Sequence, residues 1–165
     1  FIVVMIVMGL NQVMQPIAGY NFGAKLYGRV NKVLRLTIIY ATAVTTFGFL
    51  VGMLVPDLVV GIFTSDAELT ELSVTGLRIT VMFFPIIGFQ MVTSNFFQSI
   101  GMAGKAIFLS LTRQMLILLP CLLVLPQFFG VAGVWYSMPV SDLLASLIAL
   151  VMLVCQFRKF RTSPL

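Results

Sequence analysis

The charged residues of this chain gather in short clusters, and the stretches between them are about as long as a bilayer is thick. Residues 1–24, 36–56 and 79–104 carry no charge. An α-helix rises 1.5 Å per residue, so about 20 apolar residues cross the roughly 30 Å hydrocarbon core of a membrane. Only 9% of the side chains are charged and 60% are hydrophobic, whereas a soluble domain carries about 25% charged residues. The pattern predicts an all-α integral membrane protein embedded in the lipid bilayer.

Breaks in the apolar sequence divide the chain into about five membrane-spanning helices. Pro16 and the glycine-rich segment after it predict an early end for the first helix, and Ser65 with Glu68 forms a capping box that predicts a helix start. Because the chain is already apolar at Phe1, we expect that residue to lie inside a helix and the chain to be one part of a longer protein. The expected helices are residues 1–18, 25–63, 66–100, 106–125 and 131–157.

Lysine and arginine fall in every second connection, and this alternation predicts the orientation. Short loops rich in these residues face the cytoplasm, so we expect a multi-pass protein of the inner (plasma) membrane with a cytoplasmic C-terminus. Charges gathered in short clusters between long uncharged runs also argue against a nucleic-acid partner, which needs a basic patch on a folded surface. The cations after the first, third and fifth predicted helices are Lys25, Arg29, Lys32, Lys105, Arg158, Lys159 and Arg161. The other two connections hold only acids, namely Asp57, Asp66, Glu68 and Glu71.

Three ionisable side chains fall at membrane depth, where burial is costly and each is a functional candidate. Asp142 lies about 22 Å from the cytoplasmic end of helix 131–157 at 1.5 Å per residue, and Arg78 lies near the outer end of helix 66–100. We expect these two at similar depth, where they form a structural ion pair or where Asp142 serves as the ion-coupling group. Arg113 lies nearer the cytoplasmic end of helix 106–125, and its long side chain is expected to extend to the interface.

Helix 66–100 is the most polar of the predicted spans. Its second half contains Gln90, Thr93, Ser94, Asn95, Gln98 and Ser99. Gln90, Ser94 and Gln98 are four residues apart and share one face. Exposing such polar groups to lipid without hydrogen-bond partners costs free energy. They either bond to neighbouring helices or line a wet cavity, in which case Gln90, Ser94, Asn95 and Gln98 are candidate substrate contacts.

Small residues and a proline predict how the helices pack and bend. Gly48 and Gly52 form a GxxxG pair in helix 25–63, and Ala145 and Ala149 form a weaker equivalent in helix 131–157. Such spacing allows two helices to approach closely. Pro85 and the glycine three residues later predict a bend in helix 66–100.

The chain offers no set of groups for catalysis. It has no histidine, and its two cysteines, Cys121 and Cys155, lie in separate apolar runs. Their expected depths differ too much for a disulfide, which needs Cα atoms within about 7 Å. With a single deep acid there is no nucleophile, base or metal-ligand set, so we expect neither an enzyme nor a metal or cofactor site.

The residues around the first cationic cluster carry a more specific signal. They include Gln15-Pro16, Gly19-Tyr20-Asn21, Gly23-Ala24 and Arg29-Val30, in this order. That order resembles a cytoplasmic segment in the second half of the multidrug and toxic compound extrusion (MATE) family. The later stretches IFTSDAEL, FFQSIGMAGKAIFLSLTRQ and GVAGVWYSMPVSD are similar to bacterial members of that family in order and spacing.

The resemblance implies a twelve-helix transporter built of two six-helix lobes, of which this chain supplies part of the second lobe. Members of that kind expel small organic compounds, often cationic, in exchange for Na+ or H+. Two lobes that rock about a central site would provide alternating access. Sodium-coupled relatives place an acid within the helix that corresponds to 66–100. Here the uncharged run 79–104 holds none, and Asp66, Glu68 and Glu71 lie at the outer end.

Three alternatives to an exporter remain at this point. A lipid-precursor flippase of the same superfamily would be expected to carry more cations along its cavity than the two here. A membrane-embedded enzyme would need the catalytic groups that the chain lacks. A non-transporting membrane subunit is distinguished by experiment, since drug efflux by the full-length protein would exclude it.

Overall fold

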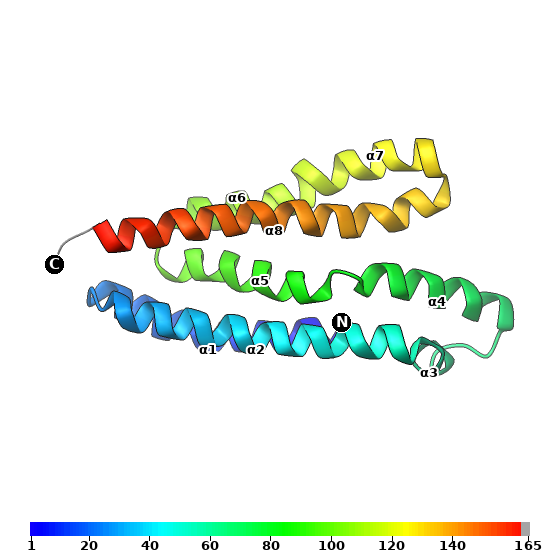
Figure 1. Ribbon diagram of the computed structural model, residues 1–165, viewed down its shortest axis with the longest axis horizontal. Coiled ribbons are helices and arrows are strands. Elements are labelled where there is room, and N and C mark those ends of the chain that lie inside the picture. The colour runs from blue at the N-terminus through cyan, green and yellow to red at the C-terminus, as the bar shows by residue number, and fades with distance from the viewer. Residues whose placement is uncertain (163–165) are drawn as a thin grey trace.

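The computed structural model describes residues 1–162, and all regular elements in that range are helical. In chain order they are α1 (Ile2–Gly23), α2 (Tyr27–Leu54), α3 (Pro56–Gly61), α4 (Ala67–Val81), α5 (Phe84–Ser99), α6 (Ala103–Leu111), the π-helical segment η1 (Thr112–Ile117), α7 (Leu118–Phe129) and α8 (Val131–Thr162). The long helices run nearly side by side in an elongated bundle (Figure 1). In it, α4 and α5 lie between the α1–α2 pair and the group formed by α6, α7 and α8.

Four stretches of the bundle are each long and apolar enough to cross a membrane, and a bent pair makes a fifth. The four are α1, α2, the continuous run Ala103–Phe129 and α8, and the pair is α4 with α5. Large apolar side chains such as Phe47, Leu119 and Leu147 are exposed on the outer faces. Soluble proteins rarely expose apolar patches of this extent. The predicted class, an all-α membrane protein with about five spans, is confirmed.

The cationic parts of the chain lie together at one end of the bundle. The α1–α2 connection, the α5–α6 connection and the end of α8 share the left-hand end of Figure 1, and the α7–α8 turn and the segment between α3 and α4 lie at the other end. Gly101 and Gly130 take positive φ angles of 78° and 64° in the turns at these two ends, which glycine adopts without strain. The charge alternation in the sequence therefore corresponds to two opposite ends of the molecule.

The first helix extends further than the predicted range 1–18. α1 continues through Pro16 to Gly23, so that only three residues separate it from α2. Pro16 is exposed. The helix continues through it although proline lacks one backbone N–H donor. The amide of Asn21 donates to the carbonyl oxygen of Ile17 at 2.8 Å. Gly19 serves packing and not a turn, because a Cβ there would lie 2.9 Å from the carbonyl oxygen of Ser99.

Prolines divide two of the predicted helices. The range 25–63 is α2 followed by the short α3, with a break at Val55 (φ −130°, ψ 46°), because the residue before a proline disfavours the helical conformation. The range 66–100 is α4 and α5, which bend by 48° just ahead of Pro85. The bend predicted there is confirmed.

The remaining boundaries differ by a few residues from the prediction. The fourth span begins at Ala103 and ends at Phe129 instead of covering 106–125, and α8 runs to Thr162 instead of 157. The N-cap of α4 is Asp66, one residue beyond the predicted Ser65. Its carboxylate accepts a hydrogen bond from the backbone N–H of Glu68 at 3.0 Å.

Small residues bring the helices together as predicted. A Cβ at Gly48 would lie 2.8 Å from Val3 of α1, and one at Gly52 would lie 2.9 Å from Val81 of α4. Ala145 and Ala149 are both buried in α8. Both cysteines are free thiols, as expected.

Candidate functional site

The candidate site lies beside α5, the helix at the centre of the bundle. α5 packs against α1, α2, α6 and α8. Its apolar residues Val92, Phe96 and Phe97 are completely buried in the core. On another part of the helix surface, Gln90, Ser94 and Asn95 line a cavity together with Arg113 and Gln114 of η1. A polar surface is thereby held inside an otherwise apolar bundle.

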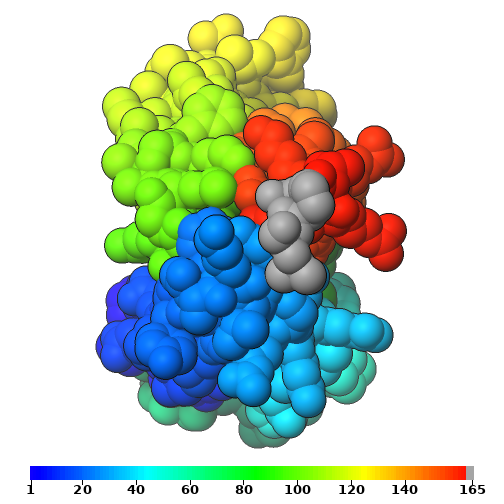
Figure 2. Space-filling view, turned by 90° about the vertical axis from the view of Figure 1, so that its left-hand side faces the viewer, coloured from blue at the N-terminus to red at the C-terminus, as the bar shows by residue number. Residues whose placement is uncertain are grey.

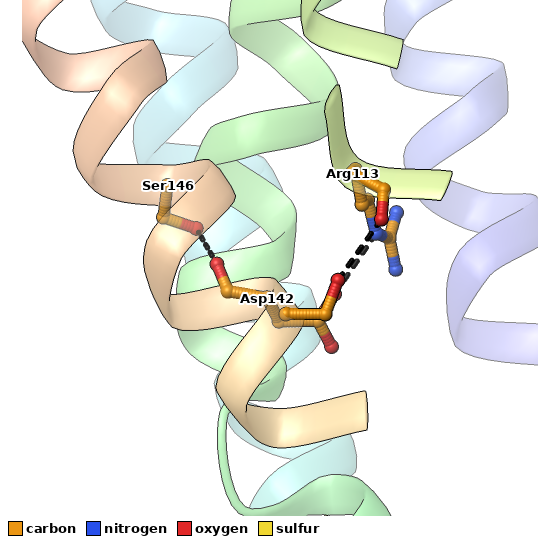
Figure 3. Close-up of polar contacts among 4 residues, drawn as sticks. Arg113, Asp142 and Ser146 are labelled. Atoms are coloured by element: carbon orange, nitrogen blue, oxygen red, sulfur yellow. Dashed lines mark hydrogen bonds and ion pairs between the residues drawn. The ribbon is translucent and has the colours of Figure 1, made fainter. Parts of the chain in front are cut away.

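An ion pair between Arg113 of η1 and Asp142 of α8 is the main electrostatic feature of this region. The guanidinium Nε lies 2.9 Å from the carboxylate Oδ1 and donates to it. The Asp142 side chain is 9% exposed and the Arg113 side chain 30% exposed. Figure 3 shows the two terminal guanidinium nitrogens turned away from the carboxylate. The pair therefore presents N–H donors on the side away from Asp142, and no acceptor for them occurs within residues 1–162.

The backbone of the same segment is also fixed to α8. Ser141 donates its hydroxyl to the carbonyl oxygen of Arg113 at 3.0 Å, and that oxygen also accepts from the N–H of Leu118 in the π-helical pattern. Ser146 donates to the backbone oxygen of Asp142 at 2.6 Å (Figure 3). Two adjacent residues of α8, Ser141 and Asp142, thus hold the backbone and the side chain of Arg113.

The π-helical turn has a local cause in the sequence. Pro120 follows η1, and its ring would clash with the carbonyl of Leu116 in a regular α-helix. A wider π turn relieves this contact, and single π turns inside α-helices are frequent at functional sites. The turn places Arg113 on the side of the helix that faces α8.

The predicted partnership of Asp142 with Arg78 is wrong. Arg78 is exposed on α4, and the only ion pair within residues 1–162 joins Arg113 to Asp142. Arg113 accordingly does not extend to the interface. The error arises from counting depth along each helix from its assumed end, whereas the register between two helices is set by the packing of their side chains.

The four polar residues predicted on α5 have different environments. Gln90 is 3% exposed, and the described part of the chain provides no donor for its Oε1. Ser94 lies 3.2 Å from the hydroxyl of Ser110 on α6. Asn95 is half-buried and bonded on both sides, as described below, while Gln98 is exposed. The structure brings Gln90, Ser94 and Asn95 together and leaves Gln98 apart.

Two adjoining cavities meet at Arg113. The smaller, of about 210 Å³, is polar and is lined by Gln90, Met91, Ser94, Asn95, Ser110, Arg113 and Gln114. The larger, of about 420 Å³, is mostly apolar and includes Met8, Phe84, Met138 and Asp142. Met91, Arg113 and Gln114 line both. An apolar space with a few convergent polar groups at one edge is the usual form of a small-molecule site.

The segment that resembles a family motif holds α1 against α5. Gln15 donates its amide to Oδ1 of Asn95 at 3.1 Å, and Asn95 in turn donates to the carbonyl of Met91 at 3.0 Å. Asn21 is buried, whereas Tyr20, Gly23, Ala24 and Arg29 are exposed at the end of the helix. Lys25 takes a φ of 58° in the connection. The motif therefore joins the cationic end of the bundle to the wall of the polar cavity.

Sequence reasoning did not single out two buried polar residues, Asn11 and Ser141. Asn11 of α1 is 2% exposed, and neither polar atom of its amide has a partner within residues 1–162. The sequence contained a signal for Asn11, because an amide side chain in the middle of an apolar helix is costly to bury. Ser141 had no such signal, since serine in a membrane helix commonly bonds to its own backbone.

Comparisons with known proteins agree with this architecture. The MatE family model matches residues 1–124. Multidrug export protein MepA of Staphylococcus aureus (strain MSSA476) is 25% identical over 146 residues, which cover 88% of this chain and 32% of MepA. The MepA of Staphylococcus saprophyticus is 21% identical over the same length.

Solved structures show the same fold. The MATE multidrug transporter DinF-BH superposes with a TM-score of 0.90 at 37% identity, over 98% of this chain and 36% of that one. A MATE transporter of the MOP superfamily in an outward-facing conformation gives a TM-score of 0.87 at 19% identity, over 95% of this chain and 36% of that one. The chain spans about a third of the length of these relatives. Since the family model covers most of the chain, this chain belongs to the MatE family.

Proposed function

We propose that this chain forms most of the second lobe of a twelve-helix exporter of the inner membrane. The exporter would expel small organic compounds, often cationic, by alternating access against a first lobe of six further helices. The observation that carries this proposal is the Arg113–Asp142 pair, which opens into a polar and an apolar cavity at once. Ionisable residues inside a membrane bundle mark substrate or ion pathways, and relatives are described as multidrug export proteins.

The coupling ion that Asp142 suits best is the proton. A guanidinium nitrogen lies 2.9 Å from its Oδ1, and that positive charge repels a sodium ion from the same carboxylate. A proton, in contrast, is taken up by covalent bonding to the carboxylate oxygen and needs no shell of further ligands. Proton binding would neutralise Asp142 and release Arg113 toward the cavities. The proposal is exchange of substrate for protons, with the Arg113–Asp142 contact changing between the two loaded states.

Gln90, Ser94 and Asn95 form the proposed substrate wall. Gln90 lines the polar cavity, and its Oε1 is buried without a donor within the described chain. A rotation of the terminal amide would turn this oxygen toward the cavity, where an N–H group of a substrate or a water would satisfy it. Gln98 shared the predicted face, but it does not line this cavity, so it is removed from the proposed wall.

Gln90→Leu is expected to lower efflux about fivefold per folded molecule, the effect of one hydrogen bond worth about 1 kcal/mol. Because the Oε1 has no donor to lose in residues 1–162, the yield of folded protein should stay near normal. Gln98→Leu is the matched control, with the same substitution on an exposed side chain outside the cavity, and should leave efflux unchanged. The measurement is efflux of a fluorescent organic cation by the full-length protein, normalised to monodisperse detergent-extracted protein. Equal efflux in the two variants would remove Gln90 from the site.

The proposed orientation places Lys25 and Lys159 in the cytoplasm and Asp66 and Glu71 outside. All four side chains are exposed. In a background without native cysteines, a membrane-impermeant thiol reagent added to intact cells should label Asp66→Cys and not Lys25→Cys. Labelling of position 25 alone would invert the orientation.

A further inference from the structure

A groove at the cationic end of the bundle lies between the beginning of α2 and the end of α8. Its volume is about 540 Å³. Figure 2 looks onto this end, where the end of α8 (red) lies beside the α1–α2 end of the bundle (blue). Both helices pack against α5 but make little direct contact with each other. The space between them is therefore open along their outer sides.

The groove changes from cationic to apolar along its length. Arg35, Arg158 and Arg161 line its outer part, near the ends of the two helices. Ile38, Ile39 and Val154 line the part that lies deeper along the same helices. In a bilayer, one end of this groove lies at the interface and the other in the hydrocarbon layer. A phospholipid has a matching order of groups along its length, with an anionic phosphate followed by apolar acyl chains.

Among residues 1–162, no acidic side chain lines the groove beside the three guanidinium groups. Its remaining lining residues are uncharged, and the only ion pair of residues 1–162 lies elsewhere, at Arg113 and Asp142. Arginine presents a planar fork of donors that matches a phosphate in two parallel hydrogen bonds. Basic pockets between helices at the cytoplasmic side of a membrane bind the headgroups of anionic lipids.

Aromatic stacking joins the start of α2 to the end of α8, outside the lining of the groove. Tyr27 at the start of α2 stacks on Phe160 of α8, with ring centroids 4.9 Å apart and planes 16° apart. Phe22 of α1 packs against the same Phe160 at 5.9 Å. These contacts hold the two helix ends at a set separation, so that the arginines are positioned before a ligand arrives. Pre-positioned groups lose less entropy on binding.

We propose that this groove is a binding site for one anionic phospholipid, with its phosphate held by Arg35, Arg158 and Arg161 and an acyl chain lying on Ile38, Ile39 and Val154. Each cation near an anionic membrane surface raises affinity about fivefold, so three arginines give a preference on the order of 100-fold for an anionic over a zwitterionic lipid. The groove shares no lining residue with the two cavities at Arg113, so it is tested by binding and not by efflux.

The test is lipid titration of the full-length protein in detergent, followed by native mass spectrometry. Dioleoyl phosphatidylglycerol should bind on the order of 100-fold more tightly than dioleoyl phosphatidylcholine. The triple variant Arg35→Gln, Arg158→Gln, Arg161→Gln should lose this preference. In the single variant Arg158→Gln, the preference for phosphatidylglycerol should fall about fivefold. This variant keeps the test decisive if the triple variant does not fold.

The matched control is Lys25→Gln, Arg29→Gln, Lys32→Gln, which removes three cations from the same end but none that line the groove. It should retain the preference for phosphatidylglycerol. An equal loss in this control would show diffuse attraction to the cationic end and overturn the site. Equal binding of phosphatidylcholine, or equally tight binding of glycerol 3-phosphate without acyl chains, would overturn it as well.

Discussion

Asp142→Asn is expected to reduce efflux driven by an imposed pH gradient to the background of vesicles without protein. Asparagine is nearly the same size but does not take up and release a proton, and it leaves the guanidinium of Arg113 without the carboxylate that lies 2.9 Å away. The measurement is extrusion of a fluorescent organic cation from proteoliposomes that contain the full-length protein, under either a pH or a sodium gradient. Full activity of the variant under the pH gradient would place the proton site outside this chain. Wild-type efflux under the sodium gradient alone would contradict proton coupling.

The same pair should dominate stability in this part of the bundle. Arg113→Gln and Asp142→Asn are each expected to lower the free energy of unfolding by about 2–3 kcal/mol, somewhat less than for a fully buried pair because Arg113 is partly exposed. The double variant should be more stable than either single one, since neither charge is then left alone. Chemical denaturation in detergent provides the measurement.

Arg78→Gln is the control for the pair, because this arginine is exposed and has no acidic partner within the described residues. It should change stability by less than about 0.5 kcal/mol. A loss as large as that of Arg113→Gln would favour the pairing expected from the sequence over the one in the structure.

Gly133→Ala is expected to be strongly destabilising. A Cβ at Gly133 would overlap the backbone of Leu125 and Pro126 in α7. Backbone atoms, unlike a side-chain tip, have no rotamer by which to move away, so α7 and α8 would have to separate. Overpacking in a tight core typically costs about 1–3 kcal/mol, and we expect the upper part of that range in chemical denaturation.

Gly28→Ala is the matched control, since a Cβ at this position in α2 meets no atom within 4 Å. It should leave stability unchanged or raise it by up to about 1 kcal/mol through helix propensity. Gly133→Ala should also displace the candidate functional site, because Asp142 lies on the same helix, α8. Efflux per folded molecule should fall in Gly133→Ala and stay unchanged in Gly28→Ala. If Gly133→Ala were as stable as the control, the close α7–α8 approach would be contradicted.

The amino-acid sequence by itself determined the class of the protein, the approximate number of spans and the two ends of the bundle. These follow from local properties, because the transfer of each residue into hydrocarbon depends little on its distant neighbours. The bend before Pro85 was equally local, since proline removes a donor and displaces the preceding residues wherever it stands. The packing role of Gly48 and Gly52 followed from spacing on one helix face.

Two predictions made from short stretches of sequence, a turn at Gly19 and a helix end at Pro16, were wrong. The sequence predicted a turn at Gly19, but this glycine allows α1 to approach the carbonyl of Ser99. Pro16 predicted a helix end, but α1 continues through it with its outer side exposed. At Gly19 the adjacent helix decided between a turn and a contact, whereas at Pro16 the helix continues although proline removes one backbone N–H donor.

The tertiary structure alone decided which charges and amides meet. Two arginines in the membrane-spanning part, Arg78 and Arg113, were possible partners for Asp142. The pair forms with Arg113 because α8 packs against η1 and the π turn before Pro120 places Arg113 on that side. Gln90 and Gln98 were equivalent by helical spacing, but only Gln90 faces the cavity at Arg113. Register between helices is a sum of many weak contacts from both partners, and no single stretch of sequence contains it.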